Sequence, residues 1–126
     1  MFEQVLVAGC ASGPSFHLDE PLSFWGGLDA ATGEIIDRRH PQAGEVVTGK
    51  VLVMAKGRGS SSGSSVLAEA IRAGTGPAAI VLGEPDEIVA LGAIVAEELY
   101  GITVPVVVAD PDLIPRNTTV TIDPPS

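Results

Sequence analysis

The pattern of apolar and polar residues predicts alternating strands and helices in the second half of the chain. Residues 51–54 (Val-Leu-Val-Met) form a continuous apolar run before a glycine-rich stretch, which is typical of a buried central strand. Apolar residues then recur at helical spacing between Val66 and Ile71. We expect Ser64 or Ser65 to cap this helix and Gly74 to end it.

The rest of the pattern predicts a mostly β first half and more alternation after it. Residues 9–33 are rich in glycine and proline, so we expect this segment to be irregular. The other expected elements are strands over residues 3–8, 34–37, 78–82, 104–108 and 119–122, and a helix over residues 86–99. Together they predict a mixed α/β fold in one domain over residues 1–126, without an internal repeat or a dividing linker.

Composition and charge narrow the function classes. The 126 residues carry a net charge of −9, which argues against nucleic acid as a partner because phosphates need a basic surface. Cys10 is the only cysteine, so an internal disulfide is impossible and a metal centre made by this chain alone is not expected. The sequence has no signal-peptide pattern and no apolar run near the roughly 20 residues of a membrane span. We therefore expect a soluble cytoplasmic domain.

The run over residues 57–65 (Gly-Arg-Gly-Ser-Ser-Ser-Gly-Ser-Ser) joins the predicted central strand to the predicted helix. The free N–H groups and the dipole of a helix N-terminus favour an anion at this place, and the glycines permit close backbone approach to a ligand. Arg58 adds a guanidinium suited to a carboxylate or a phosphate. The same donors would stabilise a serine alkoxide, so this run predicts an anion-binding loop with an activatable serine.

The alternative for this run is a flexible Gly/Ser stretch. A linker is not usually found between a buried strand and an amphipathic helix inside a small domain, so we favour the anion-binding loop. The run is not a Walker motif, because it lacks the required Gly-Lys-Ser/Thr, and its glycine spacing does not fit a Rossmann fingerprint.

A second candidate segment, residues 21–27 (Pro-Leu-Ser-Phe-Trp-Gly-Gly), contains the only tryptophan. Trp25 either covers the core or forms a wall of a site or a partner interface, and Ser23 and the two glycines are candidate hydrogen-bond donors. His40 lies in a predicted turn, where a histidine is usually structural or solvated and an acid–base role is the alternative. The spacing assigns no Ser-His-Asp triad.

Cys10 and His17 are not expected to take part in function. Cys10 is expected to be a small buried hydrophobe, and donating one ligand to a partner's metal cluster is its alternative role. His17 lies in an alternating stretch and is not expected to be functional.

Taken together, these segments resemble the small swivel subunit of the aconitase X family. The resemblance covers nearly the whole chain, from about Gly9 to Val108. Ser-Phe-Trp-Gly-Gly and Gly-Arg-Gly-Ser are specific in combination, although neither motif would suffice alone. The segments that carry the resemblance are residues 21–27, 32–37, 40–41, 49–50, 57–60, 78–81 and 92–96.

The resemblance implies a three-layer, swivelling β/β/α domain like the mobile domain of aconitase. It also implies a hydro-lyase, formed as a heterodimer with a larger subunit that is expected to carry an iron–sulfur cluster. A Gly-x-Gly-Ser loop supplies the serine base in the aconitase superfamily, and that base falls on Ser60 here. Known members dehydrate mevalonate 5-phosphate or cis-3-hydroxy-L-proline, and the acidic, alanine-rich, lysine-poor composition favours the hydroxyproline substrate.

The mechanism implied by the resemblance agrees with the chemistry of the loop. Ser60 would remove the proton α to a carboxylate, and the backbone amides of residues 59–63 would stabilise its alkoxide. The site would lie between two chains, so this chain alone is expected to be inactive. Aconitase follows its serines with Arg-Glu, which this chain lacks, so its carboxylate contacts cannot be carried over. The expected substrate-binding residues are Arg58, Gly59, Ser61, Ser62, Trp25 and His40.

Two alternatives from other classes stay open. The chain could be a non-catalytic anion-binding or interaction module on the swivel fold, which purification with a co-expressed large partner would separate from a dehydratase. It could also be a phosphohistidine-type carrier, which would need His17 or His40 on an exposed loop beside a helix N-terminus. Neither histidine follows the glycine loop, so the carrier ranks below the other two.

Overall fold

The continuous apolar runs of the second half form the centre of a β-sheet. The structure is a computed structural model that describes residues 3–57 and 62–123. Its strands are β1 (Gln4–Val7), β2 (Ala11–His17), β3 (Val51–Met54), β4 (Ala79–Leu82), β5 (Val106–Val108) and β6 (Thr119–Ile122). Its helices are α1 (Phe24–Gly27), α2 (Ser62–Ala73), α3 (Glu87–Tyr100) and the 3-10 turn η1 (Pro111–Leu113).

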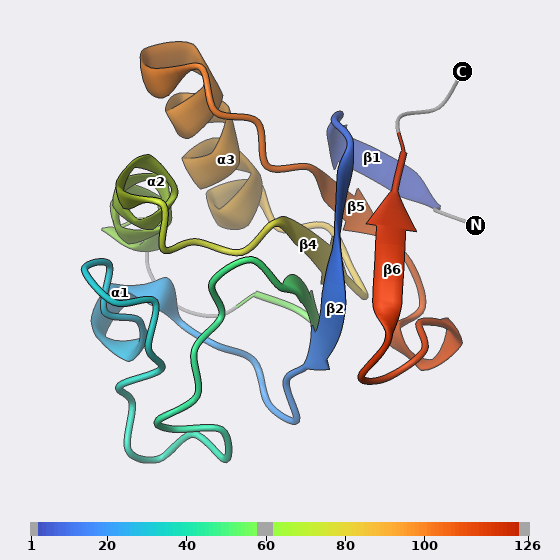
Figure 1. The fold of residues 1–126 in the computed structure, drawn as a ribbon, viewed down its shortest axis with the longest axis horizontal. Helices are drawn as coiled ribbons and strands as arrows, with labels where there is room; N and C mark the ends of the chain where they lie inside the picture. Colours follow the sequence, from blue (N-terminus) through green and yellow to red (C-terminus); the bar gives the residue numbers. More distant parts are fainter. Residues whose placement is uncertain (1–2, 58–61, 124–126) are drawn as a thin grey trace.

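Over the described residues the strands form one sheet in the order β1-β5-β4-β3-β2-β6 (Figure 1). The four inner strands, β2 to β5, are parallel, whereas β1 and β6 pair antiparallel at the two edges. Parallel strands end on the same edge of a sheet, so β2, β3, β4 and β5 all end on what we call the carboxyl edge. The expected mixed α/β class is confirmed.

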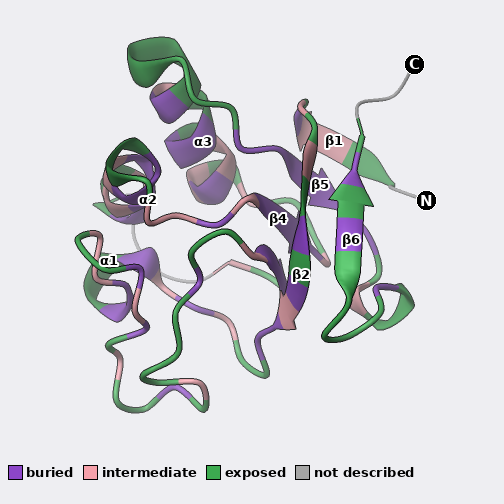
Figure 2. Cartoon of the chain, viewed as in Figure 1, coloured by how far each residue is buried: buried purple, intermediate pink, exposed green. Residues whose placement is uncertain are grey.

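The central strands β3, β4 and β5 are buried along their whole length, as Figure 2 shows for β4 and β5. Leu52 and Ile80 belong to the core beneath the helices, whereas Val53 and Val81 belong to a second core that includes Ile122 of β6. Successive residues of a strand point to opposite faces, so a run with no polar residue supplies both cores. The three layers are therefore the helices, the central strands, and β6 with the segment that follows β5.

The two long helices begin and end as the sequence predicts, with one exception. Asp86 caps α3 by accepting hydrogen bonds from the N–H groups of Ile88 and Val89, at 2.8 and 3.0 Å. Gly74, with φ of +79°, follows the last residue of α2. The expectation that Ser64 or Ser65 caps α2 is wrong, because the helix begins at Ser62 and contains both serines.

The expectation that residues 9–33 are irregular is also wrong, because this segment contains β2. Pro14 lies opposite Thr119 of β6, whereas β2 pairs with β3 only from Ser15 onward. At Pro14 the strand therefore has a partner on one side only, and a proline is tolerated there. A side chain at Gly13 would collide with the backbone carbonyl of Gly49. Gly13 therefore occurs inside a strand because a neighbouring segment approaches it closely.

The short strand expected over residues 34–37 is present only as isolated bridges. Ile35 pairs with Leu28 and Glu34 pairs with Val46. This segment follows α1 along a loop that hydrogen-bonds to itself rather than to the sheet, as in the Ile35 N–H to Glu45 carbonyl bond of 2.8 Å. The short apolar pair Ile35-Ile36 identified an extended segment but not its partners.

Candidate functional site

The predicted serine loop lies at the carboxyl edge, between β3 and α2. β3 ends at Met54 and α2 begins at Ser62, so the predicted order of strand, loop and helix is confirmed. Loops at the carboxyl ends of parallel strands are where α/β proteins bind ligands. Arg58, Gly59, Ser60 and Ser61 lie outside the described residues, and their roles stay predictions.

The two described ends of the loop have different surroundings. At its start, a side chain at Gly57 would collide with the carboxylate of Asp86. At its end, Ser62 is exposed and Gly63 is buried against α1. The loop is thus bounded by the cap of α3 on one side and by α1 on the other.

The contact between Gly57 and Asp86 joins the loops that follow β3 and β4. The Oδ1 atom of Asp86 accepts the two N–H groups that cap α3, while its other oxygen is the atom nearest to an added Gly57 side chain. From the sequence, Asp86 was expected only at the start of the helix, and this contact was not predicted. The signal was available, because a glycine and a capping aspartate that follow neighbouring parallel strands must lie on the same edge.

The tryptophan segment reaches the first turn of α2. An added side chain at Gly63 would lie 3.6 Å from the backbone nitrogen of Trp25 and 3.8 Å from the Cβ of Phe24. The structure therefore brings together two segments that are far apart in the sequence and that were both singled out from it.

The backbone of α1 turns Trp25 outward. Trp25 has a non-helical ψ of 115° and Gly26 has φ of +76°, a conformation that favours glycine. The Trp25 side chain is 61% exposed, whereas its neighbour Phe24 is buried. Trp25 therefore does not cover the core, and the alternative that it forms a wall of a site or an interface is favoured.

Ser23 does not present its hydroxyl to a ligand in this arrangement. Its Oγ donates a hydrogen bond to the Trp25 carbonyl at 3.1 Å. The expectation that Ser23 serves as a free donor is replaced by a local role, since the bond fixes the backbone that carries Trp25.

His40 is buried and uses both ring nitrogens. Its side chain is 6% exposed. The Gln42 N–H donates to Nδ1 at 3.0 Å, so Nδ1 is an acceptor and Nε2 donates to the Glu20 carbonyl at 2.9 Å. This geometry favours the structural role for His40 over the acid–base role. It also fits poorly with a phosphohistidine carrier, as does the burial of His17.

A hollow of about 340 Å³ lies between His40 and Trp25. Because His40 fixes the segment that leads from β2 to α1, it positions one wall of this hollow relative to the other. Arg39 and Asp37 contribute a cation and a carboxylate. The full lining consists of Glu20, Ser23, Trp25, Gly26, Gly27, Asp37, Arg39 and His40.

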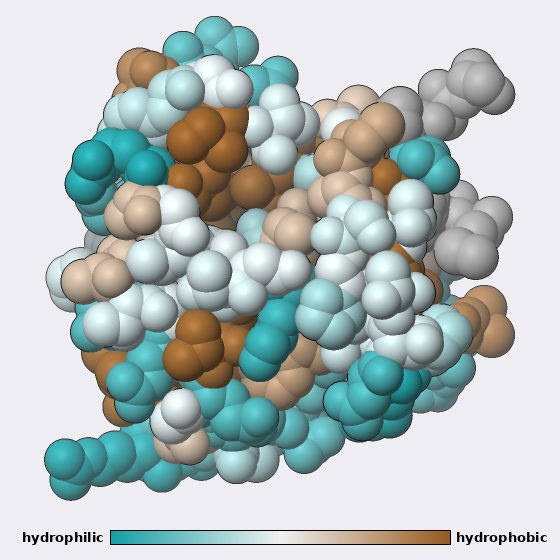
Figure 3. All heavy atoms as spheres, in the orientation of Figure 1, coloured by the Kyte–Doolittle hydropathy of each residue, from teal (hydrophilic) through white to brown (hydrophobic). Residues whose placement is uncertain are grey.

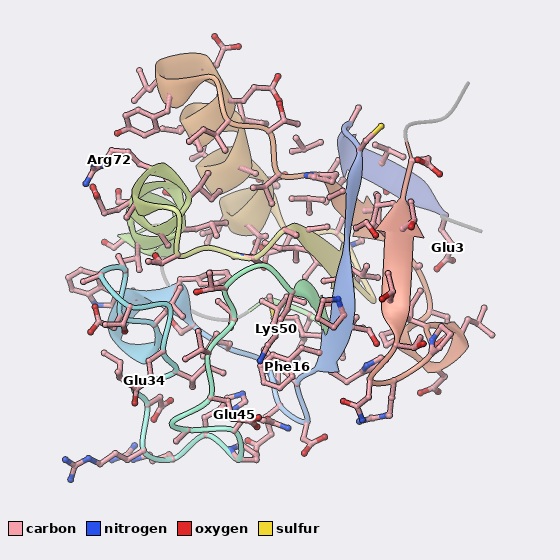
Figure 4. The ribbon with its side chains drawn as sticks, viewed as in Figure 1. Glu3, Phe16, Glu34, Glu45, Lys50 and Arg72 are labelled. Atoms are coloured by element: carbon pink, nitrogen blue, oxygen red, sulfur yellow. The ribbon has the colours of Figure 1, made fainter. Side chains whose placement is uncertain are left out.

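A second hollow of about 460 Å³ lies beside β2 and was not predicted. Figure 4 shows Lys50 and Phe16 side by side there, with Glu45 close by. The Lys50 Nζ lies 4.6 Å from the centroid of the Phe16 ring, a cation–π distance. Arg116 also lines this hollow. Its mixture of charges does not single out one ligand chemistry.

Cys10 lies at the opposite edge of the sheet from the end of β3. It precedes β2, at the edge of the sheet where the parallel strands begin, and its side chain is exposed. The expectation of a buried small hydrophobe is therefore wrong. Within residues 3–57 and 62–123, no group of three or more His, Cys, Asp or Glu side chains could hold a metal ion. No helix in the same ranges is long and apolar enough to cross a membrane.

The whole sequence, residues 1–126, matches the family model for the aconitase X swivel domain. The chain therefore belongs to the aconitase X swivel-domain family. The family expected from the sequence motifs is confirmed.

Curated relatives of two kinds are similar to this chain. It is 55% identical over 103 residues to the cis-3-hydroxy-L-proline dehydratase of Pseudomonas aeruginosa, covering 82% of this chain and 18% of that protein. It is 43% identical over 93 residues to the phosphomevalonate dehydratase small subunit of Methanothermobacter thermautotrophicus, covering 74% of this chain and 71% of that subunit. This chain thus spans less than a fifth of the first relative and most of the second.

Solved structures agree with the fold. The crystal structure of Thermococcus kodakaraensis aconitase X in its holo-form matches with a TM-score of 0.86 and 34% identity, over 95% of this chain and 88% of that one. The solution structure of a UPF0107 protein matches with a TM-score of 0.82 and 31% identity, over 98% and 91% of the two chains. The expected swivel fold is confirmed.

Proposed function

We propose that this chain is the swivel part of an aconitase X-type dehydratase and acts together with a larger polypeptide. The observation that carries the proposal is the position of the serine loop, between a buried parallel strand and the N-terminus of α2, in a chain of the aconitase X swivel family. The names of the relatives support it, since they are dehydratases or a dehydratase small subunit.

In this proposal Ser60 is the general base. It removes the proton on the carbon next to the substrate carboxylate, and the electron pair left behind forms the double bond as hydroxide leaves the neighbouring carbon. The N–H groups at the start of α2 and the helix dipole stabilise the serine oxyanion before the proton is taken. α2 has 12 residues, so its dipole is fully developed at this end.

The other predicted residues of the loop hold the substrate. Arg58 pairs with the substrate carboxylate, and the backbone of Gly59 with the hydroxyls of Ser61 and Ser62 supplies further donors. Ser62 is exposed at the first position of α2, where its hydroxyl can reach a ligand at the helix N-terminus. We assign these four residues to binding rather than to proton transfer.

Trp25 and His40 have different roles at the rim. Trp25 forms an exposed wall beside the start of α2, close enough for its backbone to contact Gly63. His40 is a positioning residue, since both ring nitrogens bind backbone groups. Neither residue transfers a proton in this mechanism.

The expected iron–sulfur cluster does not fit the described residues of this chain. They contain no group of three potential metal ligands, and the single cysteine lies at the opposite edge of the sheet from the loop. We propose that the larger polypeptide binds the cluster, and that the site is complete only when the two parts meet.

The favoured substrate is cis-3-hydroxy-L-proline rather than mevalonate 5-phosphate. Identity is higher to the bacterial hydroxyproline dehydratase, at 55%, than to the archaeal phosphomevalonate subunit, at 43%. The acidic, lysine-poor composition pointed to the same substrate. Assaying the reconstituted complex with both compounds decides between them.

The test of the catalytic assignment is Ser60→Ala, assayed with the larger polypeptide. Turnover should fall by about 10²- to 10⁴-fold, as expected for loss of a general base, while assembly measured by size-exclusion chromatography is retained. Ser65→Ala is the matched control. Ser65 is exposed on α2, about one turn after Ser62, and has no assigned role. Normal turnover of Ser60→Ala would contradict the assignment and favour a non-catalytic module.

A further inference from the structure

The hollow of about 460 Å³ beside β2 lies along the edge of that strand that β6 leaves unpaired. β6 pairs with β2 only as far as Pro14. Four consecutive residues of β2, 14–17, line the hollow, although successive side chains of a strand point to opposite faces. The hollow is therefore beside the backbone of the strand rather than over one of its faces.

The backbone N–H of His17 points toward this hollow. The N–H of Ser15, two residues earlier, donates to the Thr118 carbonyl at 2.8 Å, on the side of β2 away from β3. Residues two apart in a strand direct their N–H groups to the same side, whereas the Leu18 N–H points the other way, to the Val53 carbonyl at 2.8 Å. Among the described residues the His17 N–H has no backbone acceptor on the open side, so it is a donor available to a ligand.

Two cations that line the hollow have no carboxylate partner. Within the part of the chain that the structure describes, the one side-chain ion pair joins Arg72 to Glu69, so Lys50 and Arg116 are both unpaired. The Lys50 ammonium lies against the Phe16 ring (Figure 4), a contact that stabilises a cation without neutralising it. Together with the open N–H group, the two cations are suited to bind a carboxylate.

The carboxylates of the hollow are not equivalent. Asp19 accepts a hydrogen bond from the Gln42 Nε2 atom at 2.8 Å, and its own N–H donates to the Gln42 Oε1 atom at 3.3 Å. Glu45 is exposed, and its carboxylate has no partner in residues 3–57 and 62–123. The mixture of charges alone is compatible with several ligands, but the groups left unpaired are two cations, one N–H group and one carboxylate.

We propose that this hollow is a second ligand site, which binds a small zwitterionic amino acid. The ligand carboxylate lies between Lys50 and Arg116 and accepts the His17 N–H, while its ammonium group pairs with Glu45. The volume is in the range of small-molecule sites. Figure 3 shows mostly hydrophilic atoms on this side of the molecule, around the end of β2, which suits a ligand charged at both ends.

This site is separate from the serine loop and does not depend on the proposed function. Lys50 directly precedes β3, whereas the serine loop follows the end of the same strand. A ligand in the hollow therefore leaves the start of α2 open to a substrate.

The test is a titration of the isotope-labelled chain with L-proline, followed by nuclear magnetic resonance of the backbone amides. L-Proline carries both charges and has no hydroxyl group, so it cannot be dehydrated. The His17 amide resonance should shift and saturate with a Kd of about 1 mM, as expected for a few charge-assisted contacts to a small ligand. Cyclopentanecarboxylate, which has a five-membered ring and a carboxylate but no ammonium group, should bind at least about fivefold more weakly.

Charge-removing variants identify the contacts. Arg116→Gln and Lys50→Gln should each weaken L-proline binding at least about fivefold. Arg116 is exposed, so its replacement keeps the test valid if Lys50→Gln disturbs the contact with Phe16. Arg38→Gln is the matched control, because it makes the same change of net charge at an exposed residue outside the hollow, and it should change Kd less than about twofold. Glu45→Gln should abolish the preference for L-proline over cyclopentanecarboxylate.

Several outcomes would overturn the inference. The absence of a saturable shift at His17 would remove the site, and an equal loss in Arg116→Gln and Arg38→Gln would show that only net charge matters. Equal binding of L-proline and cyclopentanecarboxylate by the wild type would overturn the zwitterion assignment. Ser60→Ala should leave the titration unchanged, so weaker binding in that variant, or the largest shifts at the start of α2, would place the ligand at the serine loop instead.

Discussion

At Gly57, the side chain of Asp86 fills the space that a larger residue would need. The glycine at the start of the serine loop leaves room for the Asp86 carboxylate, which in turn caps α3. Gly26 is different, since its φ of +76° is a property of its own backbone and an added side chain would meet open space. The two glycines therefore constrain the site for separate physical reasons.

Gly57→Ala should disturb both the loop and the start of α3. The added methyl group displaces Asp86, so loss of the cap should lower the free energy of unfolding by about 1 to 2 kcal/mol. Urea denaturation measures this loss, and turnover of the reconstituted complex should fall with it.

A double-mutant cycle isolates the cause. In an Asp86→Ala background the methyl group no longer meets a carboxylate, so Gly57→Ala should cost much less than it does in the wild type. Equal costs in the two backgrounds would show that the contact with Asp86 is not what requires glycine.

His40→Gln tests the positioning role at the same scale. Losing the ring leaves the Glu20 carbonyl and the Gln42 N–H with poorer partners, so the free energy of unfolding should drop by about 1 to 3 kcal/mol. The pH profile of kcat should keep its shape, because His40 transfers no proton in the proposed mechanism. A profile that loses one limb would instead identify His40 as an acid or a base.

At the scale of elements, the site depends on how closely α2 approaches α3. An added side chain at Gly92 of α3 would lie 2.9 Å from the Ser64 carbonyl and 3.0 Å from the Leu67 Cδ2 atom. The carbonyl belongs to the first turn of α2, the same turn that contacts Trp25. The spacing of the two helices therefore sets the position of the N-terminus that holds the serine loop.

Gly92→Ala should consequently be destabilising in spite of the better helix propensity of alanine. The propensity gain is at most about 1 kcal/mol, and the clash with a backbone carbonyl should outweigh it, giving a net loss of about 1 kcal/mol. Thermal unfolding measures the change. Ser65→Ala is the control, because it improves propensity on the exposed side of α2 without a clash, and a stabilised Gly92→Ala would contradict the close approach.

The sequence was most informative where the helices and central strands carry a one-dimensional pattern. Apolar runs located β3 and β4, apolar residues at helical spacing located α3, and Gly74 located the end of α2. The strand β2 was missed because Gly13 and Pro14 are turn residues by type, and only the approach of Gly49 explains a glycine there. Close approach between distant segments leaves no local pattern in a sequence.

The candidate site, too, was predictable only where it follows from local sequence pattern. The order of strand, serine loop and helix followed from local pattern, and so did the choice of Trp25 as a candidate site residue. The use of both His40 nitrogens, the exposure of Cys10 and the contact of Asp86 with Gly57 did not. Each of these depends on which residues the fold brings together from distant parts of the chain.

At the scale of the whole molecule, the proposed function makes one edge of the sheet half of a site. The described residues offer the N-terminus of α2 and the exposed side chain of Trp25 there, but no set of metal ligands. In the proposed mechanism the larger polypeptide supplies the other catalytic parts.

The isolated chain should accordingly have no dehydratase activity. Incubation with cis-3-hydroxy-L-proline or mevalonate 5-phosphate should give no product, and adding the larger polypeptide should restore turnover of one of the two. Chromatographic detection of the dehydrated product checks both results. Product formation by the isolated chain would show that the site is complete without a partner.

Cys10 offers a practical consequence of the way this fold is arranged. It is the only thiol in the chain, it is exposed, and it lies at the edge of the sheet opposite the carboxyl edge. A maleimide dye would therefore attach at one known point without touching the site. Paired with a dye on the larger polypeptide, it would report by energy transfer, one molecule at a time, whether the domain swivels as substrate arrives and product leaves.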